Sequence, residues 1–230
     1  MERVVEPELL DQLPPSDPRA IHSRRDLRRI NFWMGNVGLI QKRLLELKPS
    51  PKRILEIGAG DGRLMEKLAI RFGPQWGKNV SVVFLDIHPT ISNETRNAIE
   101  AQGWKIQIVQ ANLRDWVRQS QPESFDLIIA NLFLHHFSFE ELAIFFQAFA
   151  KTTESFLSCD PRRWEPAVLF AKLLWLIGCN FVTRHDANVS IRAGFRDEEL
   201  SAIWPEESGF NLQENDASYA SHLFFARRIG

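Results

Sequence analysis

Short apolar runs alternate with amphipathic stretches through the middle of the chain. The apolar runs are rich in β-branched residues and are polar at neither face, which is typical of buried strands of a parallel sheet. We predict such strands over residues 53–57, 80–86, 104–109, 125–131 and 155–160. Apolar residues at three- and four-residue steps predict intervening helices over residues 63–73, 89–102 and 139–151. This alternation predicts an α/β fold, doubly wound, with a mostly parallel sheet.

The two ends of the chain follow a different pattern. Residues 1–20 are rich in proline and acidic residues, which favours an irregular lead-in, and residues 23–47 have helical apolar spacing that Gly35 or Gly38 could interrupt. We therefore predict an N-terminal helical arm over residues 1–50 and a main domain over residues 51–230.

The last third of the chain predicts a lid and a closing hairpin. An apolar helix over residues 164–181 precedes a polar stretch over 183–195, so we expect an insertion at about residues 161–195. A short helix is predicted over residues 195–204. Residues 210–214 and 221–228 predict a C-terminal antiparallel hairpin.

Composition narrows the class of protein. The chain has 230 residues, enough for one domain, and its net charge of −1 gives no overall field that would attract nucleic acid. Its two cysteines, Cys159 and Cys179, have no metal-ligand spacing and predict reduced thiols in a cytoplasmic protein. Residues 167–181 are too short for a membrane span and contain Lys172, so we expect a buried helix or a lid there. Four arginines between residues 24 and 29 predict a solvated face or a small anion site.

A glycine-rich turn carries the first candidate chemistry. Gly58, Gly60 and Gly62 follow the strand at 53–57 and precede a helix, which is where α/β proteins bind nucleotide-like ligands. Glu56 lies beside this turn, and a carboxylate there disfavours a pyrophosphate and favours a cation. S-adenosylmethionine has no phosphate and carries a sulfonium and an ammonium group.

The segment Glu56-Ile-Gly-Ala-Gly-Asp-Gly62 resembles the signature of the class I S-adenosylmethionine-dependent methyltransferases. The resemblance covers about residues 50–160 and implies a Rossmann-like fold with S-adenosylmethionine as methyl donor, S-adenosylhomocysteine as product and no metal. Asp86, which ends the second strand, matches the family's acidic residue for the ribose hydroxyls. Asn112 matches the adenine position, where Asp is more common. The cofactor-binding residues implied are Glu56, Gly58, Ala59, Gly60, Gly62, Asp86, Ile87, Asn112, Leu113 and Asn131.

Two histidines follow the fourth strand in Ala130-Asn-Leu-Phe-Leu-His-His-Phe137. This segment resembles the small-molecule branch of the family and lacks the Asn-Pro-Pro-aromatic motif of enzymes that methylate nucleic-acid bases. Histidine titrates near neutral pH, so we predict His136 as a catalytic general base and His135 as a substrate contact. The alternative is that one of them only packs at the sheet edge.

Further candidates lie in the arm and the lid. His185 beside Asp186 predicts a second catalytic base with an orienting carboxylate, or two neighbouring loop residues. Arg162 and Arg192 are candidates for an anionic substrate group, and Trp33 for capping the substrate. These segments resemble a bacterial subgroup that methylates polyketide-type or other aromatic products.

These features predict methyl transfer to a small molecule, at an oxygen of an aromatic or polyketide-like metabolite, by a monomer or homodimer with no membrane span. Three alternatives remain. A nicotinamide-dependent oxidoreductase would favour Gly-x-Gly-x-x-Gly, a spacing that this turn departs from. A non-catalytic S-adenosylmethionine-binding protein would not need the histidines. A nucleic-acid methyltransferase is disfavoured by the near-zero net charge.

Overall fold

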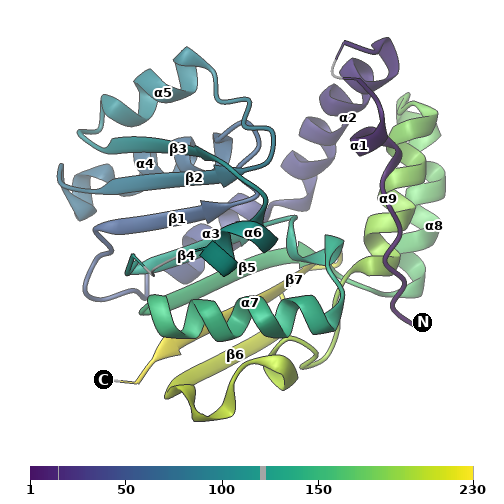
Figure 1. Cartoon of the computed structure of the whole chain (residues 1–230). Coiled ribbons are helices and arrows are strands. Elements are labelled where there is room, and N and C mark those ends of the chain that lie inside the picture. Colours follow the sequence, from purple (N-terminus) through teal and green to yellow (C-terminus); the bar gives the residue numbers. More distant parts are fainter. Residues whose placement is uncertain (15, 120–122, 230) are drawn as a thin grey trace.

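The structure, a computed structural model, describes residues 1–14, 16–119 and 123–229. Within these residues seven strands form one sheet in the order β3-β2-β1-β4-β5-β7-β6 (Figure 1). The strands are β1 (Arg53–Ile57), β2 (Ser81–Asp86), β3 (Lys105–Gln110), β4 (Leu127–Asn131), β5 (Ser155–Pro161), β6 (Phe210–Asp216) and β7 (Ser221–Arg228). β1 to β5 are parallel, and β7 runs antiparallel to both β5 and β6. The predicted α/β fold with a C-terminal antiparallel hairpin is confirmed.

Helices cover both faces of the sheet. One face packs against α3 (Asn36–Leu44), α4 (Arg63–Trp76) and α5 (Asn93–Glu100), and the other against α6 (Leu113–Gln119) and α7 (Phe139–Thr152). Alternate residues of each strand serve the two faces, so that Ile54 joins the α4 side while Leu55 joins the α7 side. Much of the aromatic content is core: Phe146 contacts Phe156, Trp204 and Phe224 at centroid distances of 5.0 to 5.7 Å.

A group of helices stands beyond the carboxyl ends of the parallel strands (Figure 1). It contains α1 (Leu9–Gln12), α2 (Pro18–Met34), α8 (Glu165–Leu173) and α9 (Phe181–Ala193). Short 3₁₀ turns complete the chain: η1 (Leu134–His136), η2 (Leu174–Ile177), η3 (Ser201–Ile203) and η4 (Glu206–Ser208). Because side chains at the carboxyl edge face this helical group, the arm and the inserted helices border the predicted site.

Local sequence signals explain most element boundaries. Ser138 and Glu141 form the predicted capping box at the start of α7. Gly35, with φ of 70°, separates α2 from α3, while Gly38 lies inside α3. α5 begins only at Asn93, not at Pro89 as predicted, because Ser92 accepts a hydrogen bond from the Thr95 N–H and caps the helix.

The structure differs from the sequence-based description of the last third at three places. The polar stretch 183–195 is mostly helix α9, which Asn180 caps by accepting from the Thr183 N–H at 2.9 Å. Residues 195–204 form turns and the short η3 rather than a helix. The apolar segment at 167–181 is also not a buried helix, since Leu169, Phe170 and Trp175 are each more than half exposed. The α9 helix was missed because its buried positions are small or polar, among them Thr183 and Asp186.

Candidate active site

The carboxylate of Asp86 ties the glycine turn to the end of β2. Its Oδ2 atom accepts the Gly60 N–H at 2.8 Å, and its Oδ1 atom accepts the His88 N–H at 2.7 Å. The Gly58 N–H donates to the Leu85 carbonyl at 2.8 Å, which joins the same two segments. An ionised carboxylate has about four lone-pair positions. Asp86 therefore keeps acceptor capacity for hydroxyl groups beside the turn.

Glycine is required at these three positions for different physical reasons. Each has a positive φ, of 66° at Gly58, 53° at Gly60 and 71° at Gly62, which disfavours any side chain. A Cβ on Gly58 would lie 2.2 Å from the Phe133 ring, and one on Gly62 would lie 3.2 Å from Ile91. Around Gly60 nothing lies within 4 Å of that position. The turn is thus open at Gly60, while Gly58 makes room for the Phe133 ring.

Glu56 is buried beneath the turn without a partner. Glu56 is 3% exposed, and its Oε2 atom accepts no hydrogen bond. Burial, with smaller contributions from the charges of Asp61 and Asp86, raises the pKa of Glu56 well above its ordinary value. Desolvation makes an unpaired carboxylate charge costly at this position. A bound cation would offset that cost and favour the ionised form of Glu56.

The remaining predicted cofactor residues lie along the same sheet edge. Ile87 is 51% exposed beside Asp86, and Asn112 accepts the Arg114 N–H at 2.9 Å at the start of α6. Leu113 is buried in the core on the α7 side. Asn131 accepts from Nδ2 of Asn36 at 3.1 Å, which joins the end of β4 to the arm.

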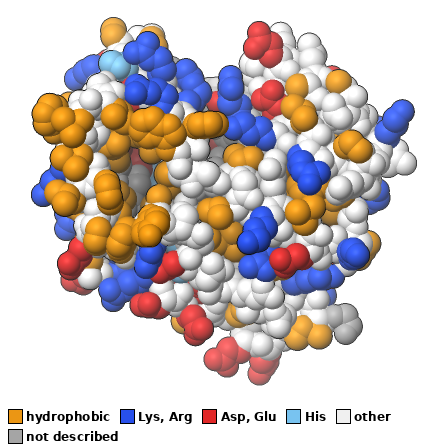
Figure 2. Space-filling model, turned by 180° about the vertical axis from the view of Figure 1, so that it is seen from behind, with side chains coloured by type: hydrophobic (Ala, Val, Ile, Leu, Met, Phe, Trp, Pro, Cys, Tyr) orange, Lys and Arg blue, Asp and Glu red, His pale blue; other side chains and the backbone are white. Residues whose placement is uncertain are grey.

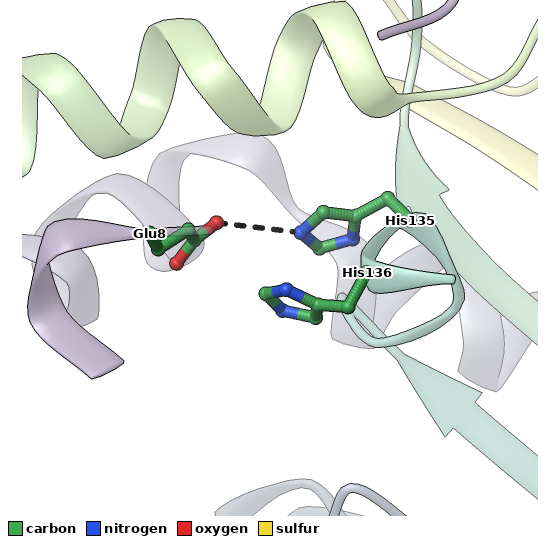
Figure 3. A group of neighbouring side chains, drawn as sticks. All are labelled: Glu8, His135 and His136. Atoms are coloured by element: carbon green, nitrogen blue, oxygen red, sulfur yellow. Dashed lines mark ion pairs between the residues drawn. The ribbon is translucent and has the colours of Figure 1, made fainter. Parts of the chain in front are cut away.

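His135 is buried between two carboxylates. Its Nδ1 atom lies 3.0 Å from Oδ1 of Asp160, at the end of β5, and its Nε2 atom lies 3.6 Å from Oε1 of Glu8. Figure 3 shows Glu8 approaching the ring from the N-terminal segment. Burial alone would lower the pKa of His135, but the two carboxylates outweigh it and raise the pKa to about 9. His135 is therefore an imidazolium at neutral pH, with both nitrogens already facing acceptors.

His136 stands beside this imidazolium, with the two ring centroids 4.2 Å apart (Figure 3). Burial lowers the pKa of His136, and the positive charge of His135 lowers it further, to about 4. Burial would raise the pKa of Glu8, but the interaction with His135 lowers it to about 2. At neutral pH the group is thus Glu8 carboxylate, His135 cation and neutral His136, and of the two histidines only His136 can accept a proton.

The N-terminal segment is fixed over these histidines by several contacts. The Arg3 guanidinium donates to the carbonyls of Phe137 and Ala193, both at 2.8 Å. The Ser190 hydroxyl donates to the Glu8 carboxylate. Arg3 and Glu8 could not be predicted as site residues from the sequence, because nothing local to a proline-rich lead-in marks them. Asp160 could have been found, since it ends a strand as Asp86 does.

The other predicted residues are more dispersed. His185 Nδ1 lies 3.0 Å from Oδ1 of Asp186, but that carboxylate also accepts the N–H groups of Leu9 and Leu10 at 2.8 and 2.9 Å. Asp186 therefore secures α1. Arg192 is half-buried on α9, where its carbonyl accepts the Val4 N–H.

Arg162 and Trp33 lie in two further places. Arg162 forms an ion pair with Asp216 at 2.7 Å and lines a polar cavity of about 360 Å³ together with Trp164 and Arg196. Trp33 is 61% exposed on α2. The structure therefore does not bring Arg162 or Trp33 into hydrogen-bonding or ring contact with the histidines.

Glu8, His135 and His136 also have the composition of a metal site. Among the described residues, these three each place one ligand atom within 4.8 Å of the other two. Asp160 and Glu8 already face both nitrogens of His135, so an ion pair accounts for the arrangement. That the site works without a metal stays a prediction.

Part of the chain is similar in sequence to known methyltransferases. Residues 54–155 match the model of a family described as a methyltransferase domain. Over 85 residues the chain is 33% identical to malonyl-[acyl-carrier protein] O-methyltransferase of Paenibacillus sp. (strain JDR-2). That match covers 36% of this chain and only 29% of the relative.

Solved structures share the fold. An O-methyltransferase family protein from Burkholderia thailandensis has a TM-score of 0.62 at 18% identity, covering 93% of this chain and 60% of that one. The plantazolicin methyltransferase BpumL, solved with S-adenosylhomocysteine, has a TM-score of 0.64 at 13% identity, covering 93% of this chain and 92% of that one. Residues 54–155 thus have the sequence of a methyltransferase domain, and the chain has the fold of the class I methyltransferases.

Proposed function

We propose that this protein transfers the methyl group of S-adenosylmethionine to an oxygen of a small-molecule acceptor of aromatic or polyketide-like type. The observation that carries the proposal is the carboxyl edge of the sheet, where Asp86, the open turn at Gly60 and the neutral His136 lie on neighbouring segments. Open α/β sheets bind their ligands at the carboxyl ends of their strands.

The residues at this edge suit a cationic nucleoside. Asp86 would accept the ribose hydroxyls, Glu56 would receive a positive charge below the turn, and the backbone at Gly60 leaves room for the ligand. S-adenosylmethionine supplies an electrophilic methyl group on a sulfonium. Several neighbours in fold were solved with S-adenosylhomocysteine, which supports this choice of cofactor.

His136 would take the acceptor's proton. In the proposed reaction an oxygen–carbon bond forms as the sulfur–carbon bond breaks, and the hydroxyl proton passes to the neutral imidazole of His136. A phenol has a pKa of about 10, so a nearby base assists the loss of its proton. His135 would not act as base, because its pKa of about 9 keeps it protonated at neutral pH.

The helical group beyond the sheet edge would enclose the acceptor. Residues 1–50 and about 161–195 form this cover in the proposal, and the contacts of Arg3 and Glu8 with the site segment support it. An oxygen acceptor is supported by the names of two similar proteins, both described as O-methyltransferases. Trp33, Arg162 and Arg192 remain predicted substrate contacts, and His185 remains a predicted second catalytic base. The protein would act as a monomer or a homodimer.

Titration calorimetry tests the cofactor, and an acceptor screen tests the reaction. We expect S-adenosylmethionine and S-adenosylhomocysteine to bind at micromolar concentration and a nicotinamide dinucleotide not to bind. Release of S-adenosylhomocysteine should then be followed with phenols, hydroxy acids and carboxylic acids. Binding of the dinucleotide alone would overturn the proposal. Cofactor binding with no turnover on any acceptor would instead favour a non-catalytic binding protein.

A further inference from the structure

Large apolar side chains are exposed together on the helical group. Phe32 and Trp33 on α2, Leu169 and Phe170 on α8, Trp175 on η2 and Phe181 on α9 have exposed fractions of 58 to 74%. We call these six residues the apolar face. Figure 2 shows hydrophobic side chains gathered over this lobe of the molecule, around a hollow. Single exposed apolar residues are ordinary, but a contiguous patch of this kind marks an interaction surface.

The charges around the apolar face are positive. Residues 18–34 contain five arginines and one acidic residue, Asp26, and residues 166–193 contain Asp186 as their one acidic residue. Both of these carboxylates are buried, at 0% and 1% exposure. Arg25, Arg28 and Lys172 are exposed, and Figure 2 shows Lys and Arg side chains along the rim of the lobe. The acidic residue Glu165, at the start of α8, is exposed beside this stretch, so basic side chains outnumber acidic ones on this surface.

The apolar face is held together by buried polar contacts. Asp26 of α2 accepts the Asn180 N–H at 3.0 Å and lies 3.2 Å from the Thr183 hydroxyl. Arg29 donates to the Ile177 carbonyl at 2.9 Å. These bonds join α2 to η2 and α9, which are three of the four elements that carry the apolar face.

We propose that the apolar face rests on an anionic lipid membrane surface, with the aromatic side chains in the interface and the arginines on lipid phosphates. Among the described helices none is long and apolar enough to cross a membrane, so the protein would lie on the bilayer. Tryptophan favours the membrane–water interface. Charge complementarity selects this occupant over a second copy, because two identical basic faces would repel each other. The proposal does not depend on the proposed function.

Vesicle sedimentation tests the proposal on the whole chain. We expect binding to vesicles of phosphatidylcholine with phosphatidylglycerol, weaker binding to phosphatidylcholine alone, and release by salt. Trp33 and Trp175 provide a direct signal, since brominated lipids should quench tryptophan fluorescence when these rings enter the interface. No binding, or equal binding to both vesicle types, would overturn the proposal.

Matched variants locate the contact. Phe170→Ser with Trp175→Ser should weaken binding about tenfold or more, and Arg25→Gln with Arg28→Gln should weaken it about fivefold for each charge removed. The control is Ile70→Ser with Ile144→Ser, which removes two apolar side chains of 54 and 55% exposure from α4 and α7. Loss of binding in the control, or light scattering that shows a dimer abolished by Trp175→Ser, would contradict a lipid partner.

Discussion

The Glu8 carboxylate lies 3.6 Å from Nε2 of His135, so a residue of the N-terminal lead-in completes a buried ion pair at the end of β4. Asp160 holds the other nitrogen of the same ring at 3.0 Å. The resulting imidazolium contributes to the lowered pKa of His136. The N-terminal segment therefore contributes to the protonation states of the site as well as covering it.

Replacing Glu8 with Gln should destabilise the protein in a pH-dependent way. The pKa of His135 rises from 6.5 to about 9 on folding, so its stabilisation is complete below pH 6.5 and disappears as the pH rises through 9. The pKa of Glu8 falls from 4.5 to about 2, so its stabilisation is fully present above pH 4.5 and is lost as the pH falls from 4.5 through about 2. Near pH 6 we expect the variant to lose about 2 kcal/mol of unfolding free energy.

Urea unfolding at several pH values measures this effect. The difference between wild type and Glu8→Gln should narrow as the pH increases from 6.5 to above 9, where His135 loses its proton. Glu100→Gln is the control, because Glu100 is an exposed carboxylate 3.9 Å from Arg96 at the end of α5. A difference that stays constant up to pH 10 would mean that Glu8 acts by packing alone.

His136→Gln should lower kcat by about 10²-fold or more, if His136 accepts the proton. The binding constant for S-adenosylmethionine should stay unchanged, since the variant leaves the glycine turn intact. With a pKa of about 4, His136 stays neutral down to weakly acidic pH, so the wild-type rate should show no inflection near 6.5. His185→Gln should have the smaller effect, because Asp186 engages its Nδ1 atom while securing α1. An inflection near pH 6.5 would contradict this assignment.

Asp86→Ala should weaken cofactor binding by about 10²-fold, because it removes the proposed acceptor for the ribose hydroxyls and frees the Gly60 N–H. Calorimetry with S-adenosylhomocysteine measures the affinity, and thermal unfolding reports on the fold. Glu100→Ala, which removes an exposed carboxylate elsewhere, should leave the affinity unchanged. Equal affinities in wild type and Asp86→Ala would place the nucleoside elsewhere.

Features encoded within one strand–turn–helix unit could be predicted from the sequence. The glycine turn and the capping box of Ser138 depend on residues a few positions apart, and the structure places them as expected. Asp86 lies 26 positions after Gly60 and ends the next strand, where it accepts the Gly60 N–H. Glu8 could not be predicted, because its partner His135 is brought to it only by the docking of the N-terminal segment on α9. At position 58 the sequence indicated that a glycine is required for the turn. It did not indicate that the Phe133 ring leaves no room for a side chain there.

Metal removal should leave the activity unchanged. The cluster of Glu8, His135 and His136 is the candidate metal group among the described residues, but the ion pair of Glu8 with His135 accounts for its charges. Dialysis against a chelator followed by rate measurement tests this, with metal analysis of the untreated protein. A stoichiometric metal, lost together with activity and restored by Zn²⁺, would show that these side chains are ligands.

Gly58→Ala should cost about 3 kcal/mol of unfolding free energy and weaken cofactor binding, because the new methyl group combines two penalties. It requires an L-residue at φ of 66°, and its Cβ would lie 2.2 Å from the Phe133 ring. Gly209→Ala separates the two, since Gly209 has φ of 71° with nothing within 4 Å, and it should cost only about 1 kcal/mol. Adding Phe133→Ala to Gly58→Ala should recover the steric part, so a double-mutant cycle should give a coupling of about 1 kcal/mol or more. If the two glycine variants lose the same stability and the cycle shows no coupling, the Phe133 ring does not require a glycine at position 58.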